Sequence, residues 1–140
     1  MWCEVHAKRR IIRYIMKAFI VTNNVLVKEK YAAEDVLFFD VSYGEILVKV
    51  RDMCHKGHKL LTHPLSGSVK PNETPFKSIM VAKEITKPDY EESVRLIELA
   101  VQTYNKFPKL DIIWNEQILD DFRAVDLELI DGAVASMLRK

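Results

Sequence analysis

The fold class follows first from the stretch KAFIVTNNVLVKEKY, residues 17–31. Its apolar run over residues 17–21 predicts a short buried strand, which ends at the polar residue Thr22. Asn24 is a favoured helix N-cap, because its side chain can accept a hydrogen bond from the first turn of a helix. The stretch therefore predicts a strand followed by a brief helix over residues 25–31.

Strands and helices continue to alternate after this stretch. Ser42 and Glu45 have the spacing of a capping box, and the apolar residues that follow recur at helical intervals until Gly57. Further strands are expected over residues 36–39, 59–62 and 77–83. Apolar runs of this kind are typical of strands that are covered on both faces. We therefore expect a layered α/β/α domain with a short, largely parallel four-stranded sheet.

The carboxyl-terminal region is expected to be helical. Asp89 and Glu92 form an acidic variant of the capping box, which predicts a helix that runs to Phe107 and stops at Pro108. Beyond it, apolar residues again recur at steps of three and four, which fits one long helix or two helices that break near Asp126. We favour two helices, since Asp126 is a good N-cap for the second.

The composition suits a single compact domain. The chain has 140 residues, of which 49% are hydrophobic, enough to bury roughly two-thirds of the unfolded surface. Cys3 and Cys54 are too few for a disulfide framework, so we expect a reducing cytoplasm. A formal net charge of +1 argues against a dedicated nucleic-acid binder, and no apolar run approaches the roughly 20 residues of a membrane span. We expect neither nucleic acid nor membrane as a partner.

The charge is unevenly distributed along the chain. Residues 1–15 hold four basic side chains against Glu4 alone. We interpret them as a basic amino-terminal extension, with Met16 as an alternative start, followed by one α/β domain over residues 16–140. The other interpretations of the extension are a surface helix and a basic binding arm.

A long polar loop follows the strand expected at residues 59–62, and it is the predicted working surface. Ligands of α/β domains usually bind where the carboxyl ends of the strands and their loops gather. Gly67, between two serines, permits a turn whose N–H and hydroxyl groups can converge on an anion. The residues that we expect to bind a small anionic ligand are Asn23, Asn24, Thr62, His63, Ser66, Gly67, Ser68, Lys70, Asn72 and Glu73. The alternative is that these polar groups mainly satisfy one another and cap helices.

Catalytic and metal sites are only weakly indicated. His63 could act as a base toward Ser66 or Ser68, but the nucleophile-elbow motif is missing and the spacing does not bring them together. A metal site would have to use Cys54, His55, His58 and His63. Adjacent helical residues such as Cys54 and His55 point about 100° apart, which suits one site poorly. We assign no catalytic residue, no metal and no cofactor.

A resemblance to a known family rests on five blocks of sequence. The blocks are IVTNN at residues 20–24, LVKEKY at 26–31, HKLLTHPLSGSVKPNETPFKS at 58–78, ILDDF at 118–122 and VDLELI at 125–130. Together they resemble the GrdX family, small proteins associated with glycine, sarcosine and betaine reductase systems. Val25 stands where a proline commonly follows the paired asparagines, and Phe76 stands where a tyrosine is common. The resemblance implies selenium-dependent amino-acid fermentation as the context, without an assigned activity or catalytic residue.

Two functional hypotheses follow. The first is a non-catalytic accessory or regulatory protein of the reductase system, which binds a small anionic metabolite or a glycine reductase component through the long loop. The second is a small enzyme that acts on a phosphorylated or acyl substrate at the same edge of the sheet. The chain has no selenocysteine and no paired cysteines, so we do not expect it to be the reductase catalyst itself.

Overall fold

The computed structural model describes residues 17–65, 70–86, 90–110 and 112–138. Along the chain its elements are β1 (Ala18–Thr22), α2 (Val25–Lys30), the 3-10 helix η1 (Ala33–Asp35), β2 (Val36–Phe38), α3 (Tyr43–His55), β3 (His58–Leu60), β4 (Ser78–Ile85), α4 (Tyr90–Lys106) and α5 (Glu116–Leu138). The strands form a four-stranded sheet in the order β2-β1-β4-β3. The α/β class predicted from the sequence is therefore confirmed.

Several predicted features fall outside the described residues. They are the basic extension over residues 1–15, the cap at Asp89, and the turn formed by Ser66, Gly67 and Ser68.

The sheet is mixed, so the expectation of a largely parallel sheet is wrong. β2 lies parallel to β1, with Ile20 paired to Val36, whereas β4 lies antiparallel to both β1 and β3. Parallel neighbours need a crossover connection, which is usually a helix. The described residues between β3 and β4 contain no helix. The chain instead turns back, and β4 pairs beside β3 in the opposite direction.

The carboxyl ends of β1, β2 and β3 nevertheless point the same way. β1 and β2 are parallel, and β1 and β3 both oppose β4. At the edge of the sheet where β4 begins, Thr22 pairs with Phe38 of β2 and with Ser78 of β4. We name this edge of the sheet the Thr22 edge. Beyond β3, Leu61 donates its backbone N–H to Met80 O at 2.9 Å. The long loop therefore follows β4 toward this edge.

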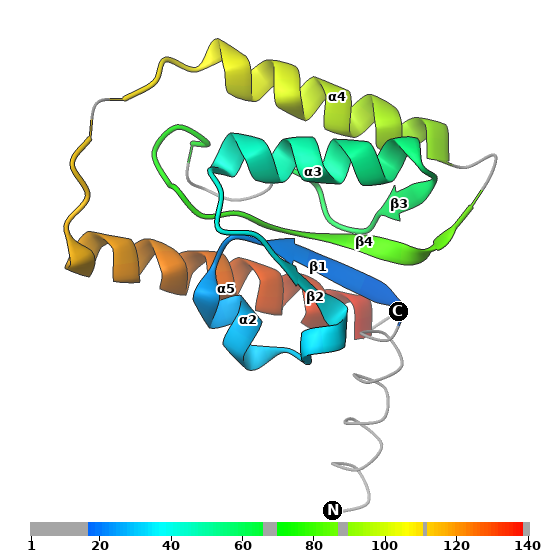
Figure 1. Cartoon of the computed structure of the whole chain (residues 1–140), viewed down its shortest axis with the longest axis horizontal. Coiled ribbons are helices and arrows are strands. Elements are labelled where there is room, and N and C mark those ends of the chain that lie inside the picture. Colours follow the sequence, from blue (N-terminus) through cyan, green and yellow to red (C-terminus); the bar gives the residue numbers. More distant parts are fainter. Residues whose placement is uncertain (1–16, 66–69, 87–89, 111, 139–140) are drawn as a thin grey trace, which may run out of the picture.

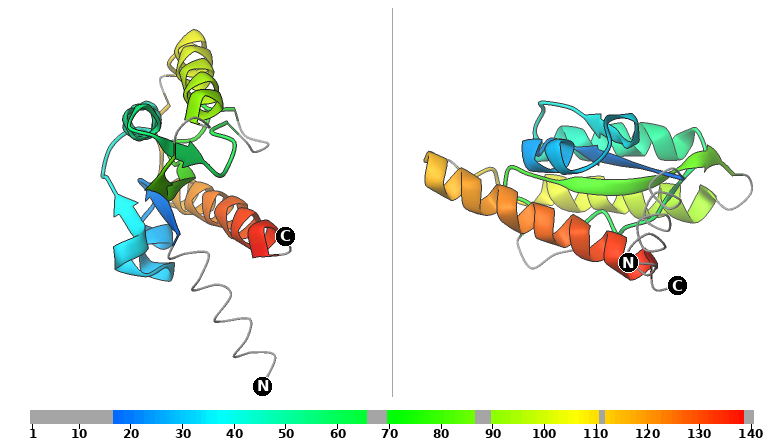
Figure 2. Two further views of the ribbon diagram at one scale, coloured as in Figure 1. Left: turned by 90° about the vertical axis from the view of Figure 1, so that its right-hand side faces the viewer. Right: turned by 90° about the horizontal axis from the view of Figure 1, so that it is seen from below.

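Helices lie on both sides of the sheet. Figure 1 shows α3 and α4 on one side of the strands and α2 and α5 on the other, and Figure 2 shows this arrangement from two further directions. Successive residues of a strand point to opposite faces. Val21 accordingly belongs to an apolar cluster with Ile46 of α3 and Ile97 of α4, while Ile20 belongs to a second cluster with Ile130 of α5. The core thus has two parts, one on each side of the sheet.

The predicted caps of α2 and α3 are confirmed. Asn24 Oδ1 accepts the backbone N–H of Leu26 at 3.1 Å, and Ser42 Oγ accepts that of Glu45 at 3.2 Å. Gly57 follows α3 with a φ of 109°, a left-handed conformation that glycine adopts at little cost. Local sequence therefore sets where these two helices begin and where α3 ends.

The carboxyl-terminal region forms one helix where two were favoured. α5 runs without a break through Asp126, which is only 6% exposed. An N-cap carboxylate accepts backbone N–H groups of its own helix. Asp126 instead accepts hydrogen bonds from the side chains of Asn24 and Ser78 on other elements. The expected break near Asp126 is wrong, because tertiary contacts occupy its carboxylate.

Candidate functional site

Asn23 joins three segments at the Thr22 edge. Its Nδ2 donates to the carbonyl oxygens of Val41 at 2.9 Å and Pro75 at 2.8 Å, and its Oδ1 accepts the N–H of Lys77 at 2.9 Å. Both amide hydrogens are therefore used inside the protein. Asn23 fixes the start of β4 against the connection between β2 and α3.

A buried polar cluster lies at the same edge; its members are Thr22, Asn24, Ser78 and Asp126. Asn24 Nδ2 donates to Asp126 Oδ2 at 3.0 Å, and Ser78 Oγ donates to the same oxygen at 2.7 Å. Thr22 Oγ1 and Ser78 Oγ are also 2.7 Å apart. Asp126 belongs to this cluster although no sequence motif indicates it. The cluster ties α5 to the ends of two strands.

The protein environment changes the ionisation of the charged groups around this cluster. Burial raises the pKa of Asp126, and hydrogen bonds from Asn24 and Ser78 and the charge of Lys77 oppose that rise. Burial lowers the pKa of Lys77, whose Nζ lies 5.9 Å from the ring centroid of Tyr43. Burial, and then the charge of Asp126, raises the pKa of Tyr43. Asp126, Lys77 and Tyr43 therefore influence one another across the edge.

Four residues of the predicted loop site have separate local roles. Thr62 Oγ1 accepts the N–H of Met80 at 3.0 Å. His63 is exposed, and its Nδ1 accepts the N–H of Leu65 at 3.1 Å. Lys70 is exposed, and its carbonyl oxygen accepts the N–H of Glu73 at 2.9 Å. None of these hydrogen bonds joins one of the four side chains to another.

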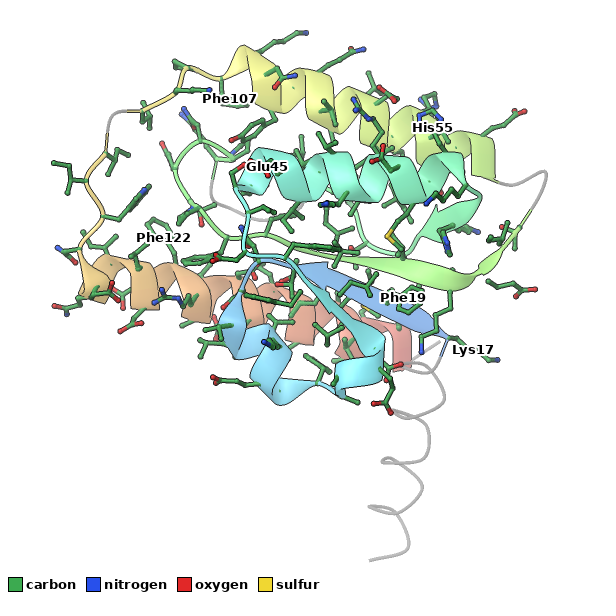
Figure 3. The ribbon with its side chains drawn as sticks, viewed as in Figure 1. Lys17, Phe19, Glu45, His55, Phe107 and Phe122 are labelled. Atoms are coloured by element: carbon green, nitrogen blue, oxygen red, sulfur yellow. The ribbon has the colours of Figure 1, made fainter. Side chains whose placement is uncertain are left out.

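The second half of the loop forms a wall of a pocket with a volume of about 390 Å³. We name it the aromatic pocket, after the rings of Tyr43, Tyr104, Phe107 and Trp114. Other lining residues are Pro71, Asn72, Thr74 and Pro75 of the loop, Ser42 before α3, and Asn105, Pro108, Lys109 and Leu110 after or near the end of α4. Asn72 is the predicted site residue, among those described, that lines it. In Figure 3, Phe107 and Phe122 mark the end of the molecule that holds this pocket.

Close ring packing shapes the pocket. The rings of Tyr43 and Tyr104 are stacked, with centroids 5.4 Å apart and planes 4° apart. Gly44 makes this packing possible, because a Cβ at that position would lie 2.5 Å from Tyr104 Cε1. Trp114 meets Phe122 of α5 edge-to-face, with centroids 5.2 Å apart. The aromatic walls are thus held by both α3 and α5.

One hydrogen bond joins the long loop to the connection from α4 to α5 at the pocket. Asn72 Nδ2 donates to the carbonyl oxygen of Pro108 at 3.0 Å. Among the described lining residues Lys109 is the charged one, and none is a carboxylate, an imidazole or a thiol. The first N–H groups of a helix lack partners within it, so the start of α3 beside Ser42 adds partial positive charge. The described surroundings favour an anion.

Sequence patterns indicate little of this pocket. Its lining comes from residues between 42 and 114, in segments that meet only in the folded chain. Trp114 and Phe107 belong to no sequence motif. From the sequence, each is as consistent with covering apolar surface as with lining a pocket. The sequence indication is that Pro71 and Pro75 each favour an extended backbone at the preceding residue, which predicts an ordered segment over residues 71–76.

Residues 19–135 match the family described as GrdX-like protein. The chain belongs to the GrdX-like family. This match spans every lining residue of the aromatic pocket and every member of the buried polar cluster. No curated protein and no solved structure matches the chain. GrdX-like proteins are associated with glycine reductase systems, which gives the chain its biological context.

Cys54, His55 and His58 of this GrdX-like chain lie in separate environments. Cys54 is 0% exposed in the core, and burial raises the pKa of its thiol to about 11. His55 Nε2 lies 2.9 Å from Glu98 Oε1, and His58 Nδ1 lies 2.7 Å from Ala82 O. Among the described residues, no group of three or more His, Cys, Asp or Glu side chains could hold a metal ion. No helix in the described ranges is long and apolar enough to cross a membrane.

Proposed function

We propose that this GrdX-like chain is a non-catalytic accessory or regulatory protein of the glycine, sarcosine and betaine reductase system, and that it binds a small anionic ligand in the aromatic pocket. The observation that carries the proposal is the charge of the lining. Lys109 lines the pocket, and none of the described lining residues is a carboxylate that would oppose its attraction for a bound anion. The binding surface includes Asn72 of the long loop, in which the sequence predicts the site.

The amino terminus of α3 also supports an anion. The start of α3 at Ser42 and Tyr43 lines the pocket, and a helix amino terminus favours negative charge by about 0.3–1 kcal/mol. Glu45 in the first turn is exposed and lies outside the lining. Its charge reduces the attraction without blocking the pocket.

Binding without turnover fits the chemistry of the lining. Ser42 Oγ accepts the N–H of Glu45, and Thr74 Oγ1 accepts the N–H of Phe76 at 3.3 Å. The raised pKa of Tyr43 makes its phenol a poor base at neutral pH. The described lining therefore offers hydrogen-bond donors and aromatic surface, and it holds no carboxylate, imidazole or thiol to abstract a proton or attack a substrate.

A protein partner is the second candidate occupant of this region. Ile113, in the connection from α4 to α5, is 95% exposed, and Leu110, Ile112 and Ile118, which are near it in sequence, are also exposed. Apolar side chains gathered beside a pocket are typical of an interaction surface. A component of the reductase system is the partner that the family context favours.

The test is a thermal-shift screen of the full chain with phosphate, acetyl phosphate, glycine, betaine and nucleotides. A ligand that binds only the folded state at 100 times its Kd stabilises it by about 2.7 kcal/mol, which raises Tm by several degrees. We expect Lys109→Met to abolish the shift and the control Lys59→Met, at an exposed position of β3, to preserve it. If no anion raises Tm and a purified reductase component binds the chain, the second candidate replaces the first.

A further inference from the structure

We infer that the anion bound in the aromatic pocket carries a planar heteroaromatic ring, so that its ligand is a nucleoside monophosphate or a close relative. This inference rests on the proposed function and adds the chemical class of the ligand. It follows from the size of the pocket, the kind of apolar surface that lines it and the sign of the surrounding charge.

The pocket is larger than a simple amino acid or inorganic anion requires. Its volume is about 390 Å³, which lies in the range of about 300–1,000 Å³ for pockets that hold drug-sized molecules. A mononucleotide combines a ring and an anionic group at this scale. Glycine or acetate would leave most of the aromatic surface in contact with water.

The apolar surface consists mainly of rings. Leu110 is the aliphatic lining residue among those described, whereas four aromatic residues and three prolines share the rest. Tyr43 and Tyr104 stack on each other, so Phe107 and Trp114 are the rings left for a ligand. Trp114 meets Phe122 edge-to-face, and the two rings are therefore not parallel. Flat surfaces of this kind favour stacking with a planar ring.

The charge decides against an organic cation. Aromatic walls can also bind an ammonium group through cation–π attraction. Lys109 in the lining would repel such a group, and no described lining residue carries a compensating negative charge. A planar ring joined to a phosphate satisfies both the rings and the positive charge. The Asn105 amide, exposed at the rim, adds a donor and an acceptor for a ring edge.

The test uses the full chain with Trp2→Phe, which leaves Trp114 as the single tryptophan. AMP, GMP, adenosine, ribose 5-phosphate, phosphate and glycine are titrated by calorimetry and by tryptophan fluorescence. We expect AMP or GMP to quench Trp114 and to bind at least tenfold more tightly than adenosine, ribose 5-phosphate or phosphate. Quenching would show that the base of the nucleotide lies against the Trp114 indole. Calorimetry alone measures affinity and does not locate the base.

Variants separate the two parts of the ligand. Lys109→Met should weaken AMP binding at least tenfold and adenosine binding little. Trp114→Leu should weaken AMP binding and leave the binding of ribose 5-phosphate, which lacks the ring, little changed. Trp114→Phe retains an aromatic face and should restore most of the AMP affinity, which guards against a folding defect in Trp114→Leu. Lys59→Met serves as the charge control.

The outcomes distinguish this inference from the proposed function. If phosphate or a small carboxylate binds as tightly as AMP and Lys109→Met weakens it, the pocket binds anions but the inference about the ring is overturned. Nucleotide binding that neither Lys109→Met nor Trp114→Leu changes also overturns it, because the ligand then lies elsewhere. If no anion in the series binds, both proposals fail.

Discussion

The hydroxyl of Ser78, the first residue of β4, donates a 2.7 Å hydrogen bond to Oδ2 of Asp126 in the middle of α5. A serine hydroxyl has one hydrogen to donate, so the contact between Thr22 and Ser78 must run from the threonine hydroxyl to Ser78 Oγ. Thr22 Oγ1 in turn accepts the N–H of Asn24. A directed chain of hydrogen bonds therefore runs from the start of α2 across two strands to the carboxylate of α5.

Removal of the central link should destabilise the fold. Ser78→Ala leaves the buried hydroxyl of Thr22 without its acceptor and deprives Asp126 of a donor. A buried polar group left unsatisfied costs about 1–3 kcal/mol, and we expect a loss of this size in urea unfolding. Ser136→Ala, at an exposed position of α5, should change the free energy of unfolding by less than about 0.5 kcal/mol. Equal effects of the two variants would contradict the role given to the chain.

Asp126 should make stability depend on pH in an unusual direction. Its raised pKa means that the folded state holds the proton more tightly than the unfolded state, whose value is about 3.9. The contribution of Asp126 to stability is therefore present below about pH 4 and is lost as the pH rises through the raised pKa. Asp126→Asn cannot lose a proton. We expect the free energy of unfolding of Asp126→Asn minus that of wild type to increase between pH 4 and pH 7 in urea titrations, because only wild type loses stability over this range. A constant difference across this range would refute the assignment.

Two glycines in helices should respond oppositely to alanine. Alanine favours a helix over glycine by about 0.5–1 kcal/mol. At Gly132 nothing lies within 4 Å of an added Cβ, so Gly132→Ala should raise stability by about that amount. At Gly44 the Cβ would lie 2.5 Å from Tyr104 Cε1, and overpacking typically costs about 1–3 kcal/mol. We expect Gly44→Ala to lower Tm and to weaken any ligand of the aromatic pocket, because Tyr104 must move.

Cys54 should be unreactive in the folded protein. Burial raises the pKa of its thiol to about 11, so little thiolate exists at pH 8, and the side chain is 0% exposed. In a Cys3→Ser variant, iodoacetamide at pH 8 should alkylate Cys54 at the rate of unfolding and label it at once in denaturant. Mass spectrometry measures both rates. Rapid labelling of the folded chain would instead indicate an accessible thiol.

Local sequence predicts the elements that depend on neighbouring residues. Asn24 and Ser42 cap the helices that follow them because the cap and its N–H partner lie within three residues. Gly57 stops α3 because its backbone conformation is a property of one residue. Of the described residues predicted for the site, Asn72 lines the aromatic pocket. The histidine of the long loop, by contrast, lies exposed, and the part of the turn around Gly67 falls outside the described residues.

The sequence by itself determined the α/β class, the helix caps and the family, since each depends on short-range order along the chain. Only the tertiary structure decided the direction of β4, the buried role of Asp126 and the aromatic pocket. An apolar run indicates that a strand is covered, but its direction depends on which distant strand it pairs with. In the same way, whether an aspartate caps a helix or binds a serine 48 positions away depends on which groups the folded chain brings into contact with it.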